Sequence, residues 1–386
     1  MTLATPTSDG VRANFAFRPC GSAPRHFDTS GPRYGKGVFP VSTPNKRKAA
    51  GWLVLAIVGV ALFAWVVPSV AVANASPLNR SGSVPASESS PPDPPSARDG
   101  PSMTYDAKDG YVLLFGGCNT HLLGGTWKLA NGKWTKLEPR VSPPARLGAS
   151  MTYDAADGYV VLFGGYRCNP ATTASCFLRD TWKFVDGSWT NISTSAAPAA
   201  RAGPTMTYDV RDRYALLFGG GNLTTHYSDT WTFVGGVWTK LSPTTHPSTR
   251  FDVGLVYDAR DGYVLLYGGN SPNFTHFHDT WTFVGGIWTK LEPQAAPSVY
   301  LDAGMVYDAK DRYVLLFGEG PEHNWEFAGG VWKTIAPNPA PVSRHYGSMA
   351  YDATDGYAVL FGGRTLEGGL ANSTWTFEAG AWTEVS

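Results

Sequence analysis

The residues best suited to chemistry in this sequence are histidines and carboxylates gathered in short polar segments. The segment HFHD, residues 276–279, offers three metal-ligand donors within four positions, and neutral imidazole is the commonest side-chain metal ligand. A second segment contains Glu319, Glu322 and His323, which could supply an acid and a base around a small pocket. Polar residues are also ordinary in loops, so we expect no metal ion and no other cofactor.

Aromatic and basic residues that depart from the regular pattern of the sequence are the better candidates for contacting a ligand. Regularly spaced tryptophans are explained by packing, whereas an irregularly placed ring is available to stack on a ligand. An arginine can bind a carboxylate through two parallel hydrogen bonds. We therefore expect ligand contacts from Tyr227, Phe274, His276, Phe277, His278, Tyr300, Arg344 and His345.

These candidates lie in a sixfold repeat. Each unit has a Tyr-Asp pair, an aromatic residue before glycine ten positions after that tyrosine, and then two tryptophans seven positions apart. The second tryptophan stands 19 positions before the next Tyr-Asp tyrosine, and the mean period is near 48 residues, which is typical of propellers and arrays. The six tyrosines are Tyr105, Tyr153, Tyr208, Tyr257, Tyr307 and Tyr351.

Each unit is expected to form four short strands. Segments such as SMTYD end in D-x-x-D-G or D-x-x-D-R, which suits a tight turn, and YVLLFGG is typical of a strand buried on both faces. TWTF and VWTK alternate apolar and polar residues, as half-buried strands do. The dipeptides between them suit a two-residue turn that needs positive φ twice, although Ala379-Gly380 suits it less well. Four-stranded sheets repeated around a ring form a β-propeller.

Only one spacing varies within the units. The gap from the aromatic residue before glycine to the first tryptophan is 12, 19, 13, 14, 8 and 14 residues. In an up-and-down blade, this loop and the connection between blades share one face, while the two kinds of tight turn share the other. Because rigid scaffolds usually place binding residues on variable loops, the loop face is the predicted binding face.

The repeats resemble the Kelch family, with an arginine, a glycine two residues later, an apolar strand ending in Gly-Gly and two spaced aromatic residues. The resemblance covers residues 98–386 and implies an all-β, six-bladed Kelch-type β-propeller. The blades are expected at about 98–140, 141–195, 196–244, 245–294, 295–337 and 338–386. Since every unit is complete, we expect the ring to close without strand exchange between the chain ends.

The arginine of the repeat recurs in five units, which favours a structural role between blades. The fifth unit has Tyr300 in its place, with FGEG for FGG and HNWEF for the usual segment around the first tryptophan. The fifth blade is therefore expected to be the irregular one. The recurring arginines are Arg98, Arg146, Arg201, Arg250 and Arg344.

The N-terminal quarter has a different composition. Residues 1–50 carry eight Lys or Arg and two Asp, a net charge of +6, and are expected to form a disordered cytoplasmic tail. Residues 51–73 are long and apolar enough for a transmembrane helix, and 74–97 form a Pro/Ser-rich linker. The basic flank predicts a single-pass cell-membrane protein with the propeller outside; a cleaved signal peptide is the alternative. The remainder of the chain is net acidic, so nucleic-acid binding is not expected.

Cysteines and asparagine triplets fit an exported domain. Cys168 and Cys176 bracket one loop and are expected to pair in an oxidising exterior, which leaves Cys118 over. Asn-x-Ser/Thr triplets are glycan acceptors where the host glycosylates. The candidate acceptors are Asn191, Asn222, Asn273 and Asn372.

The predicted function is an anchored extracytoplasmic module that binds a cell-surface protein or glycan through the loops between the second and third strands. The alternative is a carbohydrate-active enzyme, because the Kelch resemblance extends to a sialic acid mutarotase and to galactose oxidase. An oxidase of that kind needs a Tyr–Cys cross-link, and Cys118 has no identifiable tyrosine partner. A structural envelope component that associates laterally is a third hypothesis.

Overall fold

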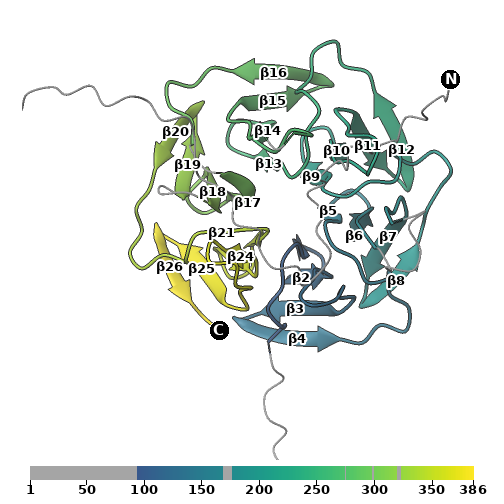
Figure 1. Ribbon diagram of the computed structural model, residues 1–386, viewed down its shortest axis with the longest axis horizontal. Helices are drawn as coiled ribbons and strands as arrows, with labels where there is room; N and C mark the ends of the chain where they lie inside the picture. Colours follow the sequence, from purple (N-terminus) through teal and green to yellow (C-terminus); the bar gives the residue numbers. More distant parts are fainter. Residues whose placement is uncertain (1–93, 168–175, 274, 298–299, 320–322) are drawn as a thin grey trace, which may run out of the picture. The chain divides into compact units, whose positions relative to one another are not determined.

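The computed structural model describes residues 94–386 apart from 168–175, 274, 298–299 and 320–322. In this part of the chain, six four-stranded antiparallel sheets form a ring, as Figure 1 shows. The predicted tail, the predicted transmembrane helix and most of the predicted linker lie outside the described residues. Within the described ranges, no helix is long and apolar enough to cross a membrane.

Each blade is built from strands that follow one another in the sequence. Blade 1 contains β1 (Ser102–Asp106), β2 (Tyr111–Phe115), β3 (Thr126–Ala130) and β4 (Lys133–Leu137). Blade 2 contains β5 (Ser150–Asp154), β6 (Tyr159–Phe163), β7 (Thr181–Val185) and β8 (Ser188–Asn191). Blade 3 contains β9 (Thr205–Asp209), β10 (Tyr214–Phe218), β11 (Thr230–Val234) and β12 (Val237–Leu241).

The second half of the ring repeats this order with small additions. Blade 4 contains β13 (Gly254–Asp258), β14 (Tyr263–Tyr267), β15 (Thr280–Val284) and β16 (Ile287–Leu291). Blade 5 contains β17 (Tyr300–Asp308), β18 (Tyr313–Glu319), β19 (Asn324–Ala328) and β20 (Val331–Thr334). Blade 6 contains β22 (Ser348–Asp352), β23 (Tyr357–Phe361), β25 (Thr374–Glu378) and β26 (Ala381–Glu384). A two-residue pair, β21 (Arg344–His345) and β24 (Arg364–Thr365), adjoins blade 6.

The tight turns take the conformations that the sequence predicts. In the D-x-x-D turn of blade 4, the Asp258 carboxylate accepts hydrogen bonds from the backbone N–H groups of Arg260 and Asp261, at 3.0 and 3.3 Å. The residue after each D-x-x-D segment has positive φ even where it is an arginine. In blade 3 this residue is Arg213, with φ 60°. At the outer hairpin turn of blade 6, Ala379 also has positive φ, 49°, so the turn type is kept at its least suitable sequence.

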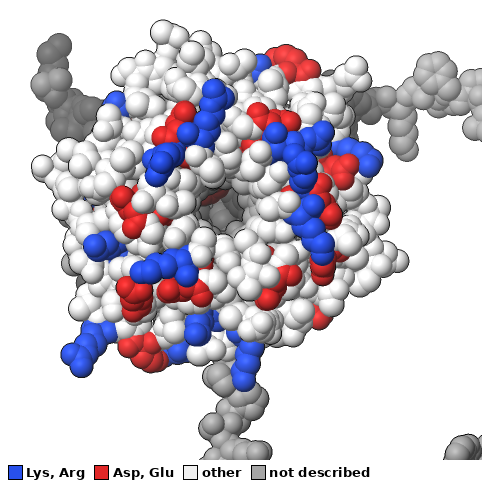
Figure 2. Space-filling view, turned by 180° about the vertical axis from the view of Figure 1, so that it is seen from behind, with Lys and Arg blue, Asp and Glu red and all other residues white. Residues whose placement is uncertain are grey.

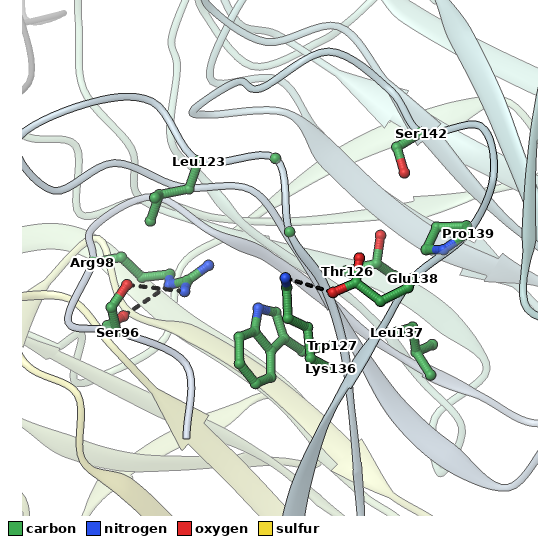
Figure 3. A pocket seen from close by; sticks show the side chains of 12 residues that line it. Ser96, Arg98, Leu123, Thr126, Trp127, Lys136, Leu137, Glu138, Pro139 and Ser142 are labelled. Carbon is green, nitrogen blue, oxygen red and sulfur yellow. Dashed lines mark hydrogen bonds and ion pairs between the residues drawn. The ribbon is translucent and has the colours of Figure 1, made fainter. Parts of the chain in front are cut away.

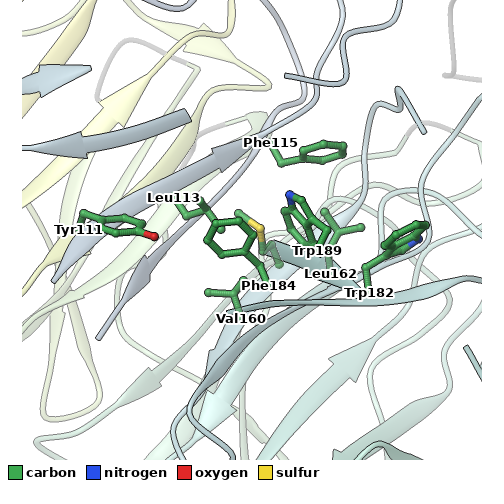
Figure 4. Packing of buried hydrophobic residues seen from close by; sticks show 9 residues of the cluster. Tyr111, Leu113, Phe115, Val160, Leu162, Trp182, Phe184 and Trp189 are labelled. Carbon is green, nitrogen blue, oxygen red and sulfur yellow. The ribbon is translucent and has the colours of Figure 1, made fainter. Parts of the chain in front are cut away.

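The second tryptophan of each repeat holds neighbouring blades together. Trp238 of blade 3 donates its indole N–H to Thr181 Oγ1 of blade 2 at 2.9 Å, and its ring lies 5.1 Å from that of Phe163. The apolar clusters accordingly combine residues of two blades. Figure 4 shows one such cluster, in which Phe115 of blade 1 faces Trp189 of blade 2. The packing role predicted for these tryptophans is confirmed.

The ring closes with the same contacts. The indole N–H of Trp134 in blade 1 donates to Thr374 Oγ1 of blade 6 at 2.8 Å, and the Trp134 and Phe361 ring centroids are 5.1 Å apart. Asp99 and Arg364 add an ion pair of 2.7 Å across this seam. No strand is exchanged between the ends of the described chain, so the predicted mode of closure is confirmed.

Blade 5 is the irregular blade, as predicted. Its first strand, β17, has nine residues and β18 has seven, whereas the corresponding strands of blade 4 have five. The register shifts between Tyr300 and Gly304. The longer strands carry the backbone pairing out to Tyr300 and Glu319, where the other blades have a loop.

The two faces of the ring differ in the segments they carry. The Asp212 carboxylate of blade 3 accepts a hydrogen bond from the backbone N–H of Gly285 in blade 4, so D-x-x-D and Gly-Gly turns lie on the same face. Figure 2 shows the face opposite the one seen in Figure 1, with basic and acidic side chains interspersed around a central opening. Neither positive nor negative side chains form a large patch on the face shown in Figure 2.

Candidate ligand-binding site

The loops of variable length lie against the connections between blades. Backbone bridges join Asp99 to Cys118 in blade 1 and Ala202 to Gly221 in blade 3. In each pair, the first residue belongs to the connection that enters the blade and the second to the loop between the blade's second and third strands. The sequence prediction that these segments share one face is therefore confirmed, and we call it the loop face.

A buried arginine stands beneath each connection, except in blade 5. Arg201 of blade 3 is fully buried and donates to the carbonyl oxygens of Ala199 and Gly219, both at 2.9 Å. All of these partners belong to the connection or to blade 3 itself. The backbone of Arg201 is bonded to the preceding blade, because its N–H donates to Leu178 O at 3.0 Å and its carbonyl accepts from the N–H of Gly165 at 2.8 Å. Its side chain binds blade 3, so the structural role predicted for the arginine between blades is confirmed.

In blades 2 to 4 this arginine binds a carboxylate through both terminal nitrogens. Arg201 Nη1 and Nη2 donate to Asp229 Oδ1 and Oδ2 at 2.5 and 3.0 Å. The first tryptophan of the repeat, Trp231, donates its indole N–H to Asp229 Oδ2 at 2.8 Å. The same three-part contact recurs in the sets Arg146, Asp180 and Trp182 and Arg250, Asp279 and Trp281.

Titration of these aspartates should reveal the ion pairs. Burial alone would raise the pKa of Asp229, but the hydrogen bonds and positive charge of Arg201 outweigh burial and hold the pKa below the ordinary value of 3.8. A carboxyl whose pKa is depressed on folding stabilises the protein above the unfolded pKa and loses that effect as pH falls through the folded pKa.

We expect Asp229→Asn to lower the free energy of unfolding by about 2 kcal/mol at pH 7, because charged hydrogen bonds are lost. The gap between variant and wild type should stay constant down to about pH 4 and narrow below the ordinary aspartate pKa of 3.8. Urea titrations at several pH values measure this gap. A difference in unfolding free energy that stays constant down to pH 2 would contradict the lowered pKa of Asp229 in its ion pair with Arg201.

Two predicted ligand-contacting aromatics pack on these arginines. The Tyr227 ring lies 3.8 Å from the Arg201 guanidinium carbon, and the Phe277 ring lies 3.9 Å from that of Arg250. Such contacts are favourable cation–π arrangements. Both aromatic residues are half-buried and form part of the arginine pocket.

Blade 1 lacks the carboxylate. The position of Asp229 is taken by Gly125, whose carbonyl oxygen accepts from the N–H of Gly116 at 3.3 Å, as the carbonyl of Asp229 does from Gly219. Arg98 is 2% exposed, and in the described part of the chain no acidic side chain pairs with it. Burial lowers the pKa of Arg98 to about 10.

In blade 6 the same position is occupied by a hydroxyl group. Ser373 Oγ accepts from Arg344 Nη1 at 3.1 Å, and the indole N–H of Trp375 donates to the same oxygen at 3.2 Å. Burial lowers the pKa of Arg344 as well. Arg344, a predicted ligand contact, is therefore already engaged by its own blade.

A cavity of about 380 Å³ opens beside Arg98. It is lined by Leu123, Thr126, Trp127 and the outer-strand residue Lys136, among others. Figure 3 shows the Arg98 guanidinium and the Trp127 indole on the same side of this cavity, with Ser96 bound to the arginine. A cavity of about 500 Å³ lies at the same place in blade 3, where Asp229 is part of the lining.

The predicted histidines do not form one centre. His276 Nδ1 lies 2.7 Å from Asn270 Oδ1, and His278 Nδ1 lies 3.5 Å from the Tyr267 hydroxyl. His345 packs its ring against Tyr346 at 4.8 Å. Asp279, the third donor of the HFHD segment, is bound to Arg250, so each of the three donors already has another partner.

The predicted acid–base group of blade 5 is described only in part. His323 packs edge-on against Phe317, with ring centroids 5.6 Å apart. Glu319 is described by its backbone pairing with Tyr300. Glu322, Phe274 and the side chains of Glu319 and Tyr300 lie outside what the structure describes.

The expectation that Cys118 is left over is wrong. Both Cys118 and Cys176 are disulfide-bonded, and no cysteine among the described residues is free. Cys118 is buried beside the connection that enters blade 1, a position that spacing along the sequence did not suggest for a bonded cysteine. Cys168, the predicted partner of Cys176, lies outside the described residues.

The candidate glycan acceptors differ in their surroundings. Asn191, Asn273 and Asn372 are exposed. The amide nitrogen of Asn222 instead donates to Ala200 O and Tyr227 Oη at 3.0 and 3.1 Å. A glycan on Asn222 would have to break at least one of these bonds.

Fold and site together define a six-bladed β-propeller. Residues 81–245 match the family described as the KLHDC2/KLHL20/DRC7 Kelch-repeats domain. No curated protein matches the chain. Among solved structures, "Structure of YjhT" is similar with a TM-score of 0.57 at 16% identity, covering 76% of this chain and 99% of that one. That similarity shows the fold.

Proposed function

We propose that this protein is a membrane-anchored, extracytoplasmic Kelch propeller that binds a protein or glycan at the cell surface through its loop face. One observation carries the proposal. The segments that vary in length between blades, and the residues that break the repeat, lie on the loop face beside the connections. The opposite face carries tight turns of nearly constant sequence, which leave little to distinguish one partner from another.

Anchoring and topology rest on the sequence. The apolar run 51–73 follows three consecutive basic residues, 46–48, a charge bias that places the N-terminus in the cytoplasm. The Pro/Ser-rich linker then holds the propeller away from the membrane surface.

Site-specific photo-cross-linking of the full-length chain in intact cells tests the proposal. A benzoylphenylalanine in place of Leu223, which is 44% exposed in a loop of the loop face, should cross-link to a partner. The same residue in place of Val237, which is 58% exposed beside a Gly-Gly turn, is the matched control and should give less than about a tenth of that yield.

Two experiments test the two parts of the proposal, the binding surface and the membrane topology. Cross-linking from both positions equally, or from Val237 alone, would exclude the loop face as the binding surface. Digestion of intact cells with an added protease should remove the propeller and leave the N-terminal tail protected. A propeller that survives such digestion but is cut in lysed cells would contradict the topology.

A further inference from the structure

Blade 1 keeps the buried arginine, its carbonyl partners and the tryptophan of the arginine pocket, but it lacks the carboxylate, and Leu123 stands where blade 3 has Tyr227. Arg98 is held in place by the carbonyl oxygens of Ser96 and Gly116, both at 2.9 Å. A side chain is missing at Gly125, and a Cβ atom there would lie 3.0 Å from Trp127 Nε1. The missing side chain would thus point toward the indole N–H, where the aspartates of blades 2 to 4 place an oxygen.

The other blades show what this pair of donors binds. Where Asp180, Asp229 and Asp279 stand, one carboxylate oxygen accepts from the arginine alone and the other accepts from both the arginine and the tryptophan. In the described part of the chain, no hydrogen-bond acceptor takes that place beside Arg98 and Trp127. A buried cation without a counter-charge favours an anion from outside.

We propose that the blade 1 pocket binds the carboxylate group of a ligand in the position that an aspartate fills in blades 2 to 4. The inference rests on the proposed function and names the chemistry of what the loop face recognises. The carboxylate would accept from both terminal nitrogens of Arg98, a bidentate geometry that suits guanidinium, and from the indole N–H of Trp127.

The rest of the pocket limits the ligand. Leu123, Leu137 and Pro139 give the cavity apolar walls. Lys136 and Glu138, which also line the cavity, form an ion pair with each other at 2.6 Å. A volume of about 380 Å³ exceeds what a carboxylate alone requires. The cavity therefore suits a small organic acid with an apolar body, or an acidic side chain of a bound protein.

Thermal melting of the full-length protein in detergent, titrated with sodium acetate, tests the site. We expect acetate at about ten times its dissociation constant to raise Tm by roughly 2 °C or more, in a saturable manner. Sodium chloride at equal ionic strength and acetamide, a neutral analogue of similar size, should have no such effect.

Gly125→Asp is the decisive variant. The φ of Gly125 lies outside the left-handed region, so an aspartate is allowed there once the partly exposed Trp127 moves by a few tenths of an ångström. The variant should melt about 2–4 °C above wild type and lose the acetate response. Gly125→Asn, which fills the same space without charge, should lose the response without the gain in Tm.

A second variant tests the site in reverse. Asp229→Gly should lower Tm and add a second saturable acetate response, because it gives blade 3 the arrangement of blade 1. An equal acetate response in wild type and Gly125→Asp, or none in wild type, would overturn the proposal. These results do not depend on partner cross-linking, so this proposal can fail while the loop face still binds a partner.

The effect of acetate and of Gly125→Asp on partner cross-linking distinguishes the two sources of the carboxylate. If it belongs to an acidic side chain of a bound protein, acetate and Gly125→Asp should both reduce the cross-link from position 223. If it belongs to a small organic acid, both should leave that cross-link unchanged while the acetate shift in Tm persists.

Discussion

Arg201→Met is expected to lower the free energy of unfolding by about 3–5 kcal/mol, the usual cost of removing one partner of a buried ion pair. The substitution removes two hydrogen bonds to Asp229 and one each to the carbonyl oxygens of Ala199 and Gly219. It also leaves the Asp229 carboxylate, whose side chain is 13% exposed, with Trp231 as its remaining side-chain donor. Chemical denaturation of the full-length protein measures the loss.

A double-mutant cycle separates the ion pair from the packing. Replacing both Arg201 and Asp229 by apolar residues should restore most of the loss, since an apolar pair of similar volume is often neutral at buried sites. Arg98→Met is the matched single control and should cost about 1–2 kcal/mol, because it takes the arginine donor from the carbonyl oxygens of Ser96 and Gly116 but leaves no carboxylate without its partner. Equal losses for Arg98→Met and Arg201→Met would show that the carboxylate is not the reason for the larger effect.

Trp134→Ala is expected to destabilise the ring by about 3–5 kcal/mol, as large-to-small substitutions of buried aromatic residues do. Trp134 is 3% exposed, packs on Phe361 and donates to Thr374 across the seam between blades 1 and 6. Since the chain does not connect these blades directly, their contact depends on such side chains. Thermal or urea unfolding measures the loss.

The matched control lies at a seam that the chain does connect. Trp238→Ala removes the equivalent contacts with Phe163 and Thr181 and should cost a similar amount, because the two environments are nearly identical. Thr374→Val, which removes the hydroxyl that accepts from Trp134 at the closing seam and from Ser386, should cost about 1–2 kcal/mol. A loss for Trp134→Ala under 1 kcal/mol would mean that the ring does not depend on this seam.

The blades could be predicted because their spacing repeats. Ten positions from Tyr-Asp to the aromatic residue and seven between the tryptophans correspond to hairpins of fixed length. Because every blade meets the same neighbours, one solution of the packing problem recurs six times. The irregular fifth blade was equally visible, since a longer pairing up to Tyr300 replaces the missing arginine and Gly-Gly.

The candidate site was predicted less well. The sequence pointed to residues that are present and irregular, such as Tyr227 and Phe277, and these pack on arginines 26 and 27 positions away, a contact that no spacing indicates. The pocket of blade 1 is marked instead by a residue that is missing. The signal was the segment GGTW, residues 124–127, where blades 2 to 4 have Asp-Thr-Trp.

The uninterrupted order of strands within each blade means that the starting point of the ring is arbitrary. Joining Ser386 directly to Pro91 would place Tyr105 19 positions after Trp382, the same step that links the other blades. A circularly permuted chain with this junction, opened between residues 244 and 245, would keep all six blades intact. Its two new ends would lie in one connection of the loop face, where a second domain or a reporter could be attached.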